Sequence, residues 1–107
     1  MTINFEYHGK YCIIFPGNDL GMMDMAEKLG RTLENLIEQG NKHICVDLNK
    51  APVIDSRVIG ALVDYHKKLS QENGELVVIS KHNMAIEAMM SMRLGRIMRF
   101  VETKQEL

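Results

Sequence analysis

Apolar residues recur along this chain with two periods, one typical of strands and one of helices. Residues 3–7 alternate apolar and polar side chains, which predicts a strand with one wet face. A turn at 8–10 and an apolar run at 11–15 predict a second strand, paired antiparallel with the first. Pro16 ends this hairpin, because proline cannot donate a hydrogen bond to a sheet.

Helical spacing of apolar residues follows in three segments. The first, 22–37, carries charged residues on its other face and ends before a glycine, and the second, 58–69, starts directly after Asp55-Ser56. Asn83 is placed to cap a third, shorter helix. The apolar positions of this third helix are Ile86, Met89, Met90 and Leu94.

Short β-rich runs separate these helices. The runs at 44–48 and 76–79 are apolar enough for buried strands, and a final strand is expected around 98–103, before a charged tail. Strands that alternate with helices form right-handed crossovers and parallel sheets. The sequence therefore predicts one α/β domain over residues 1–107. It has a mixed, mainly parallel sheet that begins with an N-terminal hairpin, and its helices pack mostly on one side.

Composition and charge narrow the functional classes. The 13 basic residues are scattered and the net charge is -1, so a nucleic-acid partner is not expected. No apolar run approaches the roughly 20 residues of a membrane span, and the N-terminus lacks a signal-peptide pattern. We therefore expect a cytoplasmic protein without membrane insertion. Cys12 and Cys45 lie in apolar runs without metal-ligand spacing, which favours reduced, buried thiols.

Motifs for catalysis or ligand binding are absent from the sequence. It has no P-loop, no GxGxxG, no GxSxG and no convergent polar cluster for a small molecule or nucleotide. Asp47 and Asp55 are better explained by a strand end and a helix cap than by a carboxylate pair. We expect no enzyme activity, no catalytic residue, no cofactor and no bound metal. The histidines fall on separate predicted elements: His8, His43, His66 and His82.

Nine methionines are the unusual feature of the composition. Those that fall on the apolar stripes of the predicted helices are expected to fill the core. Met23 and Met92 fall off the apolar stripes, and for these two a core role and a role in an adaptable protein-binding surface are equally compatible with the pattern.

The segment that leads into the second helix carries the most informative motif. As caps of that helix, Asp55 and Ser56 would contribute about 1 kcal/mol of stability. The residues of the motif are 44–48, Asp55-Ser56 and Ile59-Gly60-Ala61-Leu62. Together they resemble the central motif of the STAS family, the sulfate-transporter and anti-sigma-factor-antagonist domain. The likeness continues through 74–79 and covers nearly the whole chain.

The resemblance implies a regulatory protein that switches partners. Stand-alone STAS proteins are anti-sigma factor antagonists: they bind an anti-sigma factor that is a serine kinase, the kinase phosphorylates a serine of the motif, and a phosphatase removes the phosphate. That serine is Ser56 here, where a phosphate would add about -1.5 to -2 charges to the interface. The protein is expected to be a monomer or weak dimer. The implied partner-binding residues are Asp55, Ser56, Arg57, Val58 and Ile59.

Two positions differ from the family motif. Arg57 stands at its second serine and Val58 at its first glycine, so a branched side chain is expected on the surface that a partner approaches. Arg57 either pairs with a phosphate on Ser56 or keeps a kinase from reaching it. The alternative function is a STAS subunit that binds its partner constitutively, as a scaffold of a stress-signalling assembly or a cytoplasmic component of a transporter.

Overall fold

The chain begins with a tight β-hairpin. Strands β1 (Asn4–His8) and β2 (Tyr11–Phe15) pair antiparallel, and a two-residue turn of Gly9 and Lys10 joins them. Gly9 has a φ of +60°, a left-handed conformation that tight hairpin turns require and that glycine adopts without strain. The predicted hairpin is confirmed.

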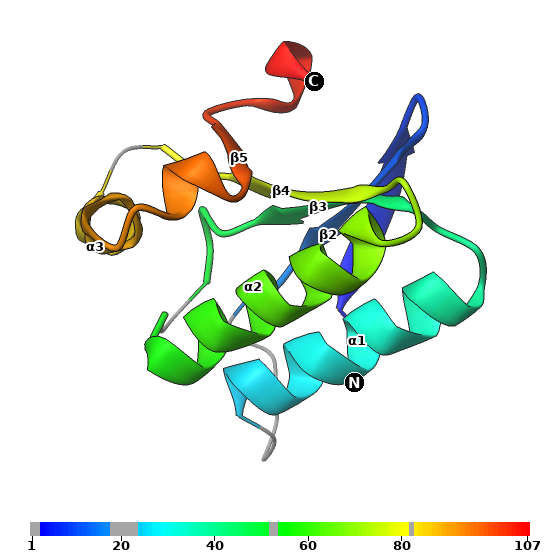
Figure 1. The fold of residues 1–107 in the computed structure, drawn as a ribbon, viewed down its shortest axis with the longest axis horizontal. Helices are drawn as coiled ribbons and strands as arrows, with labels where there is room; N and C mark the ends of the chain where they lie inside the picture. Colours follow the sequence, from blue (N-terminus) through cyan, green and yellow to red (C-terminus); the bar gives the residue numbers. More distant parts are fainter. Residues whose placement is uncertain (1–2, 18–23, 52–53, 82) are drawn as a thin grey trace.

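A five-stranded sheet, in the order β1-β2-β3-β4-β5, forms the centre of the protein (Figure 1). Strands β3 (His43–Asp47), β4 (Glu75–Ile79) and β5 (Arg99–Val101) each pair parallel with the strand before them. Among the strands of the described residues, only the hairpin pair is antiparallel. The predicted mixed, mainly parallel sheet of one α/β domain is therefore confirmed. This computed structural model describes residues 3–17, 24–51, 54–81 and 83–107, apart from the Ala85 side chain.

Two long helices cover one face of the sheet. Helices α1 (Met25–Glu38) and α2 (Ser56–Ser70) lie side by side against it (Figure 1). The shorter α3 (Met84–Ser91) adds Ile86 and Met89 to the same core. The placement of the helices mostly on one side is confirmed. Met22 and Met23, from the predicted start of the first helix, lie outside the described residues.

The third helix is shorter than predicted. It ends at Ser91, and Leu94 belongs to a separate 3-10 turn, η1 (Leu94–Arg96). The cause is Arg93, whose φ of 61° cannot continue a right-handed helix. Met90, predicted as a core position, is 44% exposed, because the side of α3 that packs in the core is formed by Ile86 and Met89.

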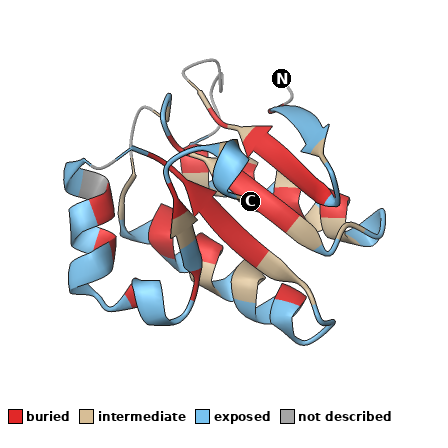
Figure 2. Ribbon diagram, turned by 90° about the horizontal axis from the view of Figure 1, so that it is seen from above, coloured by how far each residue is buried: buried red, intermediate tan, exposed pale blue. Residues whose placement is uncertain are grey.

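The C-terminal residues form structure on the other face of the sheet, where the sequence predicted only a charged tail. A 3-10 turn, η2 (Lys104–Glu106), lies above the strands (Figure 2). Its capping box joins Thr103 and Glu106, and Lys104 Nζ lies 2.8 Å from Glu6 Oε2 of β1. Leu107 packs against a second apolar cluster, formed by Tyr11, Ile13, Cys45, Val77, Ile79 and Val101.

His66, Cys12 and Cys45 have structural roles. The Nδ1 atom of His66 accepts the Leu76 N–H at 3.1 Å, which satisfies a buried strand end. Cys12 and Cys45 are buried and free, and burial raises the pKa of both thiols, to about 12 for Cys45, so they are poor nucleophiles. His82 lies outside the described residues. Within the described ranges, no helix is long and apolar enough to cross a membrane, and no group of three acidic, His or Cys side chains suits a metal.

Candidate functional site

The start of α2 is organised by Asp55. Its Oδ1 atom accepts the backbone N–H groups of Arg57 at 3.0 Å and Val58 at 3.1 Å, so Asp55 is the N-cap. Ser56 is the first helical residue; its side chain is exposed and makes no hydrogen bond to the described part of the chain. The predicted capping role is therefore confirmed for Asp55 and wrong for Ser56, whose hydroxyl is free. Ser56 and Arg57 are both exposed at this helix start.

Arg57 ties the starts of the two long helices together. Its guanidinium lies 2.9 Å from Asp24 Oδ2 and 3.6 Å from Asp55 Oδ2. Asp24 is itself the N-cap of α1, because its side chain accepts the Glu27 N–H at 2.8 Å. The sequence pattern placed Asp24 on the charged face of the first predicted helix, although the Asp24-to-Glu27 spacing is a recognisable cap signal. Arg57 is thus already occupied by two carboxylates beside Ser56.

These contacts shift the pKa values of Asp24, Asp55 and Arg57. Hydrogen bonds from the first-turn N–H groups, of Val58 for Asp55 and of Glu27 for Asp24, lower the pKa of both carboxyls, and the Arg57 charge lowers them further. The hydrogen bond and charge of Asp24, followed by the charge of Asp55, raise the pKa of Arg57. At neutral pH the surface around Ser56 therefore carries two carboxylates and one guanidinium.

Two of the implied partner-binding side chains do not reach this surface. Val58 is 1% exposed and Ile59 is 9% exposed, and both pack in the core beneath α2. The expectation that Val58 places a branched side chain on the surface is wrong, because position 58 faces the sheet. Gly60 is exposed instead, one turn after Ser56, and a methyl group there would meet no atom within 4 Å. The side chains that outline the surface are those of Asp55, Ser56 and Arg57, next to the bare backbone of Gly60.

This geometry gives a stability prediction. Asp55→Ala is expected to lower the melting temperature by roughly 5 °C, since two helix N–H groups lose their acceptor, while Ser56→Ala changes it by less than about 1 °C. The pKa of Asp55 is lower in the folded state than in the unfolded chain. Its contribution to the free energy of unfolding is therefore complete above the ordinary aspartate pKa, and it is lost as the pH falls through the pKa of the folded state. The difference between wild type and Asp55→Ala, followed by circular dichroism, should therefore vanish in strong acid. An equal loss in Ser56→Ala would show that Ser56 is a second cap.

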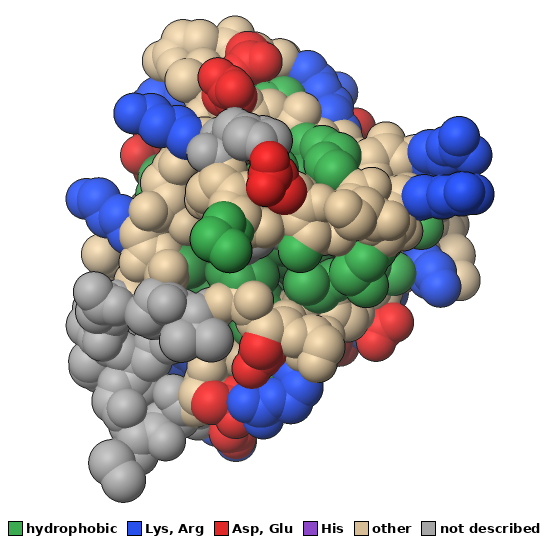
Figure 3. All heavy atoms as spheres, turned by 90° about the vertical axis from the view of Figure 1, so that its left-hand side faces the viewer, with side chains coloured by type: hydrophobic (Ala, Val, Ile, Leu, Met, Phe, Trp, Pro, Cys, Tyr) green, Lys and Arg blue, Asp and Glu red, His purple; other side chains and the backbone are tan. Residues whose placement is uncertain are grey.

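Exposed apolar side chains gather on the face that carries α3. Figure 3 shows hydrophobic side chains across the middle of the face that carries α3, with acidic and basic side chains below them. Met92, one of the two off-stripe methionines, is exposed here, while Met23 lies outside the described residues. Exposed, flexible methionines suit contact with another protein. The exposed apolar residues of α3 and the turn after it are Met84, Met90, Met92 and Ile97.

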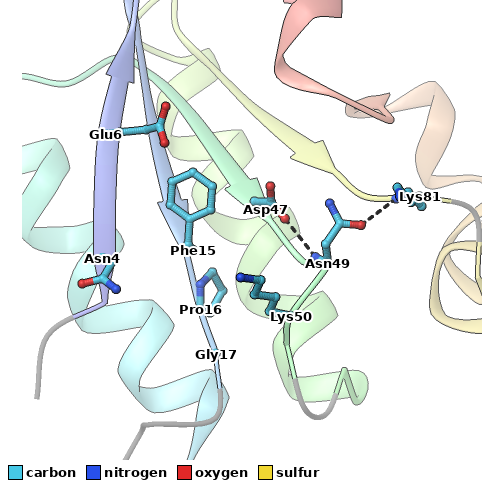
Figure 4. Close-up of a pocket in the computed structure, with 9 residues that line it drawn as sticks. All are labelled: Asn4, Glu6, Phe15, Pro16, Gly17, Asp47, Asn49, Lys50 and Lys81. Atoms are coloured by element: carbon cyan, nitrogen blue, oxygen red, sulfur yellow. Dashed lines mark hydrogen bonds between the residues drawn. The ribbon is translucent and has the colours of Figure 1, made fainter.

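A cavity of about 1030 Å³ lies at the carboxyl ends of β2 and β3 (Figure 4). Asp47 accepts the Asn49 N–H at 2.9 Å, and the Asn49 side chain accepts the Lys81 N–H at 2.9 Å. The sequence predicted no convergent polar cluster, and the fold brings polar side chains of three separate segments together here. Its wide opening and its mixture of acidic and basic side chains select no particular ligand. The polar side chains that line it are Asn4, Glu6, Asp47, Asn49, Lys50 and Lys81.

The family of the chain follows from this fold and from a direct sequence match. A single α/β domain has a free serine at the first position of the helix that follows its central parallel strand. The family model of the STAS domain matches residues 21–107. The chain therefore belongs to the STAS domain family, which confirms the resemblance found in the motif that ends at Leu62. None of the curated proteins matches the chain.

Solved structures with the same fold include three bacterial proteins. Protein TM1081 from Thermotoga maritima has a TM-score of 0.81 and 18% identity, over 97% of this chain and 89% of that chain. An anti-sigma factor antagonist from Mycobacterium paratuberculosis has a TM-score of 0.79 and 18% identity, over 98% and 88%. The Bacillus cell fate determinant SpoIIAA, in its phosphorylated form, has a TM-score of 0.70 and 16% identity, over 98% and 95%. At these identities the similarity concerns the fold.

Proposed function

We propose that this protein is an anti-sigma factor antagonist that switches partners under the control of Ser56 phosphorylation. It binds an anti-sigma factor of the serine-kinase type, and it acts in the cytoplasm as a regulator without enzyme activity. The single observation that carries the proposal is the free, exposed Ser56 hydroxyl at the start of α2 in a STAS domain. Two proteins of the same fold are anti-sigma factor antagonists, and one of these, SpoIIAA, has been solved with and without phosphorylation.

Access to Ser56 supports this role. Its hydroxyl needs no rearrangement of the helix to reach a kinase, because Asp55 alone holds the two first-turn N–H groups. The bare backbone at Gly60 lets a partner approach α2 closely on the same side. The methionine patch, formed by the exposed Met84, Met90, Met92 and Ile97 of α3 and the turn after it, offers apolar contact area to a partner. Protein–protein interfaces usually combine apolar and polar surface.

A phosphate on Ser56 would make the net charge of this surface strongly negative. Asp24, Asp55 and Arg57 together carry a charge of -1, which the phosphate changes to about -3. The N–H groups that would otherwise receive it are bonded to Asp55, so the phosphate must compete with two carboxylates for Arg57. A partner surface that fits the unmodified protein then faces an excess of negative charge that is costly to desolvate. The complex should separate while the domain stays folded, and a phosphatase would restore the binding form.

The proposal is tested by isolating the protein from its native cells and incubating it with the serine kinase that copurifies with it. We expect ATP-dependent phosphorylation of Ser56, its loss in Ser56→Ala, and its retention in the matched control Ser91→Ala, which removes another exposed serine. Mass spectrometry of the tryptic peptides locates the phosphate. If a stable partner copurifies but Ser56 remains unmodified with ATP, the switch is refuted and the constitutive STAS subunit becomes the function.

A further inference from the structure

Strand β1 is an edge strand that is exposed on both faces. The sequence predicted one wet face only, yet Phe5 is 54% exposed and Tyr7 is 59% exposed. The exposure of β1 is visible at the margin of the sheet in Figure 2. The two rings pack edge to face, with centroids 5.9 Å apart, and the Tyr7 hydroxyl donates to Asn41 Oδ1 at 3.3 Å. The pair is thus held in place while both rings remain accessible.

The hairpin determines which backbone groups of β1 are free. His8 and Tyr11 close a two-residue turn and form a hydrogen-bonded pair, and such pairs alternate along an antiparallel ladder. Glu6 therefore bonds to β2, whereas the N–H and C=O groups of Phe5 and Tyr7 point away from the sheet. The exposed aromatic residues are also the residues with free backbone groups.

Nothing in β1 blocks pairing with another strand. It contains no proline and no lysine, and its five residues form an unbroken ladder with β2. Its one acidic side chain, Glu6, is neutralised by Lys104 at 2.8 Å. The opposite edge differs, because β5 has only three residues and leads directly into the C-terminal turn. The edge of β1 is therefore the better template for an added strand.

We propose that a second copy of this chain pairs with β1, antiparallel and about a two-fold axis through Glu6, to form a ten-stranded sheet across the dimer. Phe5 of each copy lies opposite Tyr7 of the other, and each such pair exchanges both backbone hydrogen bonds. Cross-strand aromatic pairs add to the stability of the sheet. The two central Glu6 side chains keep their own Lys104 partners, so charge is balanced at the axis.

A self-complementary partner is favoured because this short edge fits itself in register. The contact is limited to one strand, so its area is small and the dimer is expected to be weak and dependent on concentration. In Figure 1, β1 and the start of α2 lie on different sides of the molecule. The dimer therefore leaves both Ser56 surfaces free and presents two of them to partners. The inference does not depend on the proposed function, since self-association and kinase binding are measured separately.

Sedimentation velocity on the purified protein tests the dimer. We expect a shift with concentration toward twice the 12.2 kDa mass of one chain. Phe5→Lys and Tyr7→Lys should each raise the dissociation constant at least tenfold, because a lysine on an edge opposes strand pairing. Met84→Lys, a matched change at an exposed apolar residue of α3, should leave it unchanged. A wild-type protein that stays monomeric at millimolar concentration, or an equal loss of dimer in Met84→Lys, would overturn the proposal.

A cysteine placed at the axis tests the register. In a non-hydrogen-bonded pair the two Cα atoms are about 4.5 Å apart, a distance that a disulfide can bridge. Glu6→Cys should therefore give a disulfide-linked dimer on mild oxidation. Asn4→Cys, on the same strand and face but opposite His8 of the other copy, should not. The native cysteines are buried and do not interfere. Equal crosslinking of both variants would refute this register.

Discussion

Ser56→Glu is expected to weaken binding of the proposed kinase-type partner by at least about tenfold, while Ser56→Ala binds as tightly as the wild type. The new carboxylate adds negative charge beside Asp24 and Asp55, whose shared cation, Arg57, is already occupied. Charge of one sign at the centre of an interface has a desolvation cost that a partner can offset only with a matching cation. Glutamate carries less charge than a phosphate, so full phosphorylation should have the larger effect. Isothermal titration calorimetry with the unmodified partner measures each affinity.

Ser91→Glu is the matched control for this experiment. Ser91 is an exposed serine at the end of α3, next to the methionine patch, so the change adds the same charge without touching the start of α2. Melting temperatures should agree within about 1 °C among the Ser56 variants, because Ser56 forms no cap and a carboxylate suits a helix N-terminus. If Ser91→Glu weakens binding as much as Ser56→Glu, the interface is sensitive to charge in general and Ser56 has no special role.

Gly74→Ala is expected to cost about 3 kcal/mol in the free energy of unfolding. A Cβ atom at Gly74 would lie 2.9 Å from the carbonyl carbon of Lys42 and closer still to its oxygen. That same oxygen accepts the Glu75 N–H at 2.9 Å. The start of β4 must therefore move away from the start of β3, which disturbs the central parallel pair. Urea denaturation gives the change in stability.

Gly60→Ala provides the comparison. Position 60 lies inside α2, where a methyl group meets no atom within 4 Å, so alanine should raise the free energy of unfolding by about 0.5–1 kcal/mol. The same methyl group lies beside Ser56 on the proposed partner surface and should weaken partner binding. A Gly60→Ala protein that is more stable and binds normally would place the partner elsewhere. Equal stability of Gly74→Ala and wild type would contradict the close approach at Lys42.

The local sequence was sufficient to predict those strands and helices in which each side is either buried or exposed along its whole length. The strand that ends at Ile79 is apolar on both faces because both are covered, and α2 shows a clear 3.6-residue period because one side rests on the sheet. The cap at Asp55 follows from chemistry within three residues. A cap of this kind depends on residues that are close in the sequence, so the local sequence pattern predicts it.

Tertiary structure alone decided which surfaces remain open. Phe5 and Tyr7 have the spacing of a core face, but β1 stands at the edge of the sheet beyond the cover of α1, so both are exposed. Arg57 finds Asp24, 33 positions away in the sequence, because the two long helices begin side by side.

For the candidate site, the sequence by itself determined that a STAS domain presents Asp55 and Ser56 at the start of a helix. It did not determine that Val58 faces inward and Gly60 outward, because the orientation of α2 on the sheet selects the buried side. Nor did it determine that the C-terminal residues cover the second face, since Leu107 gains its contacts only from strands that are distant in sequence. The physical reason is the same in each case: local pattern specifies how the backbone folds, and packing between distant segments specifies which side chains water reaches.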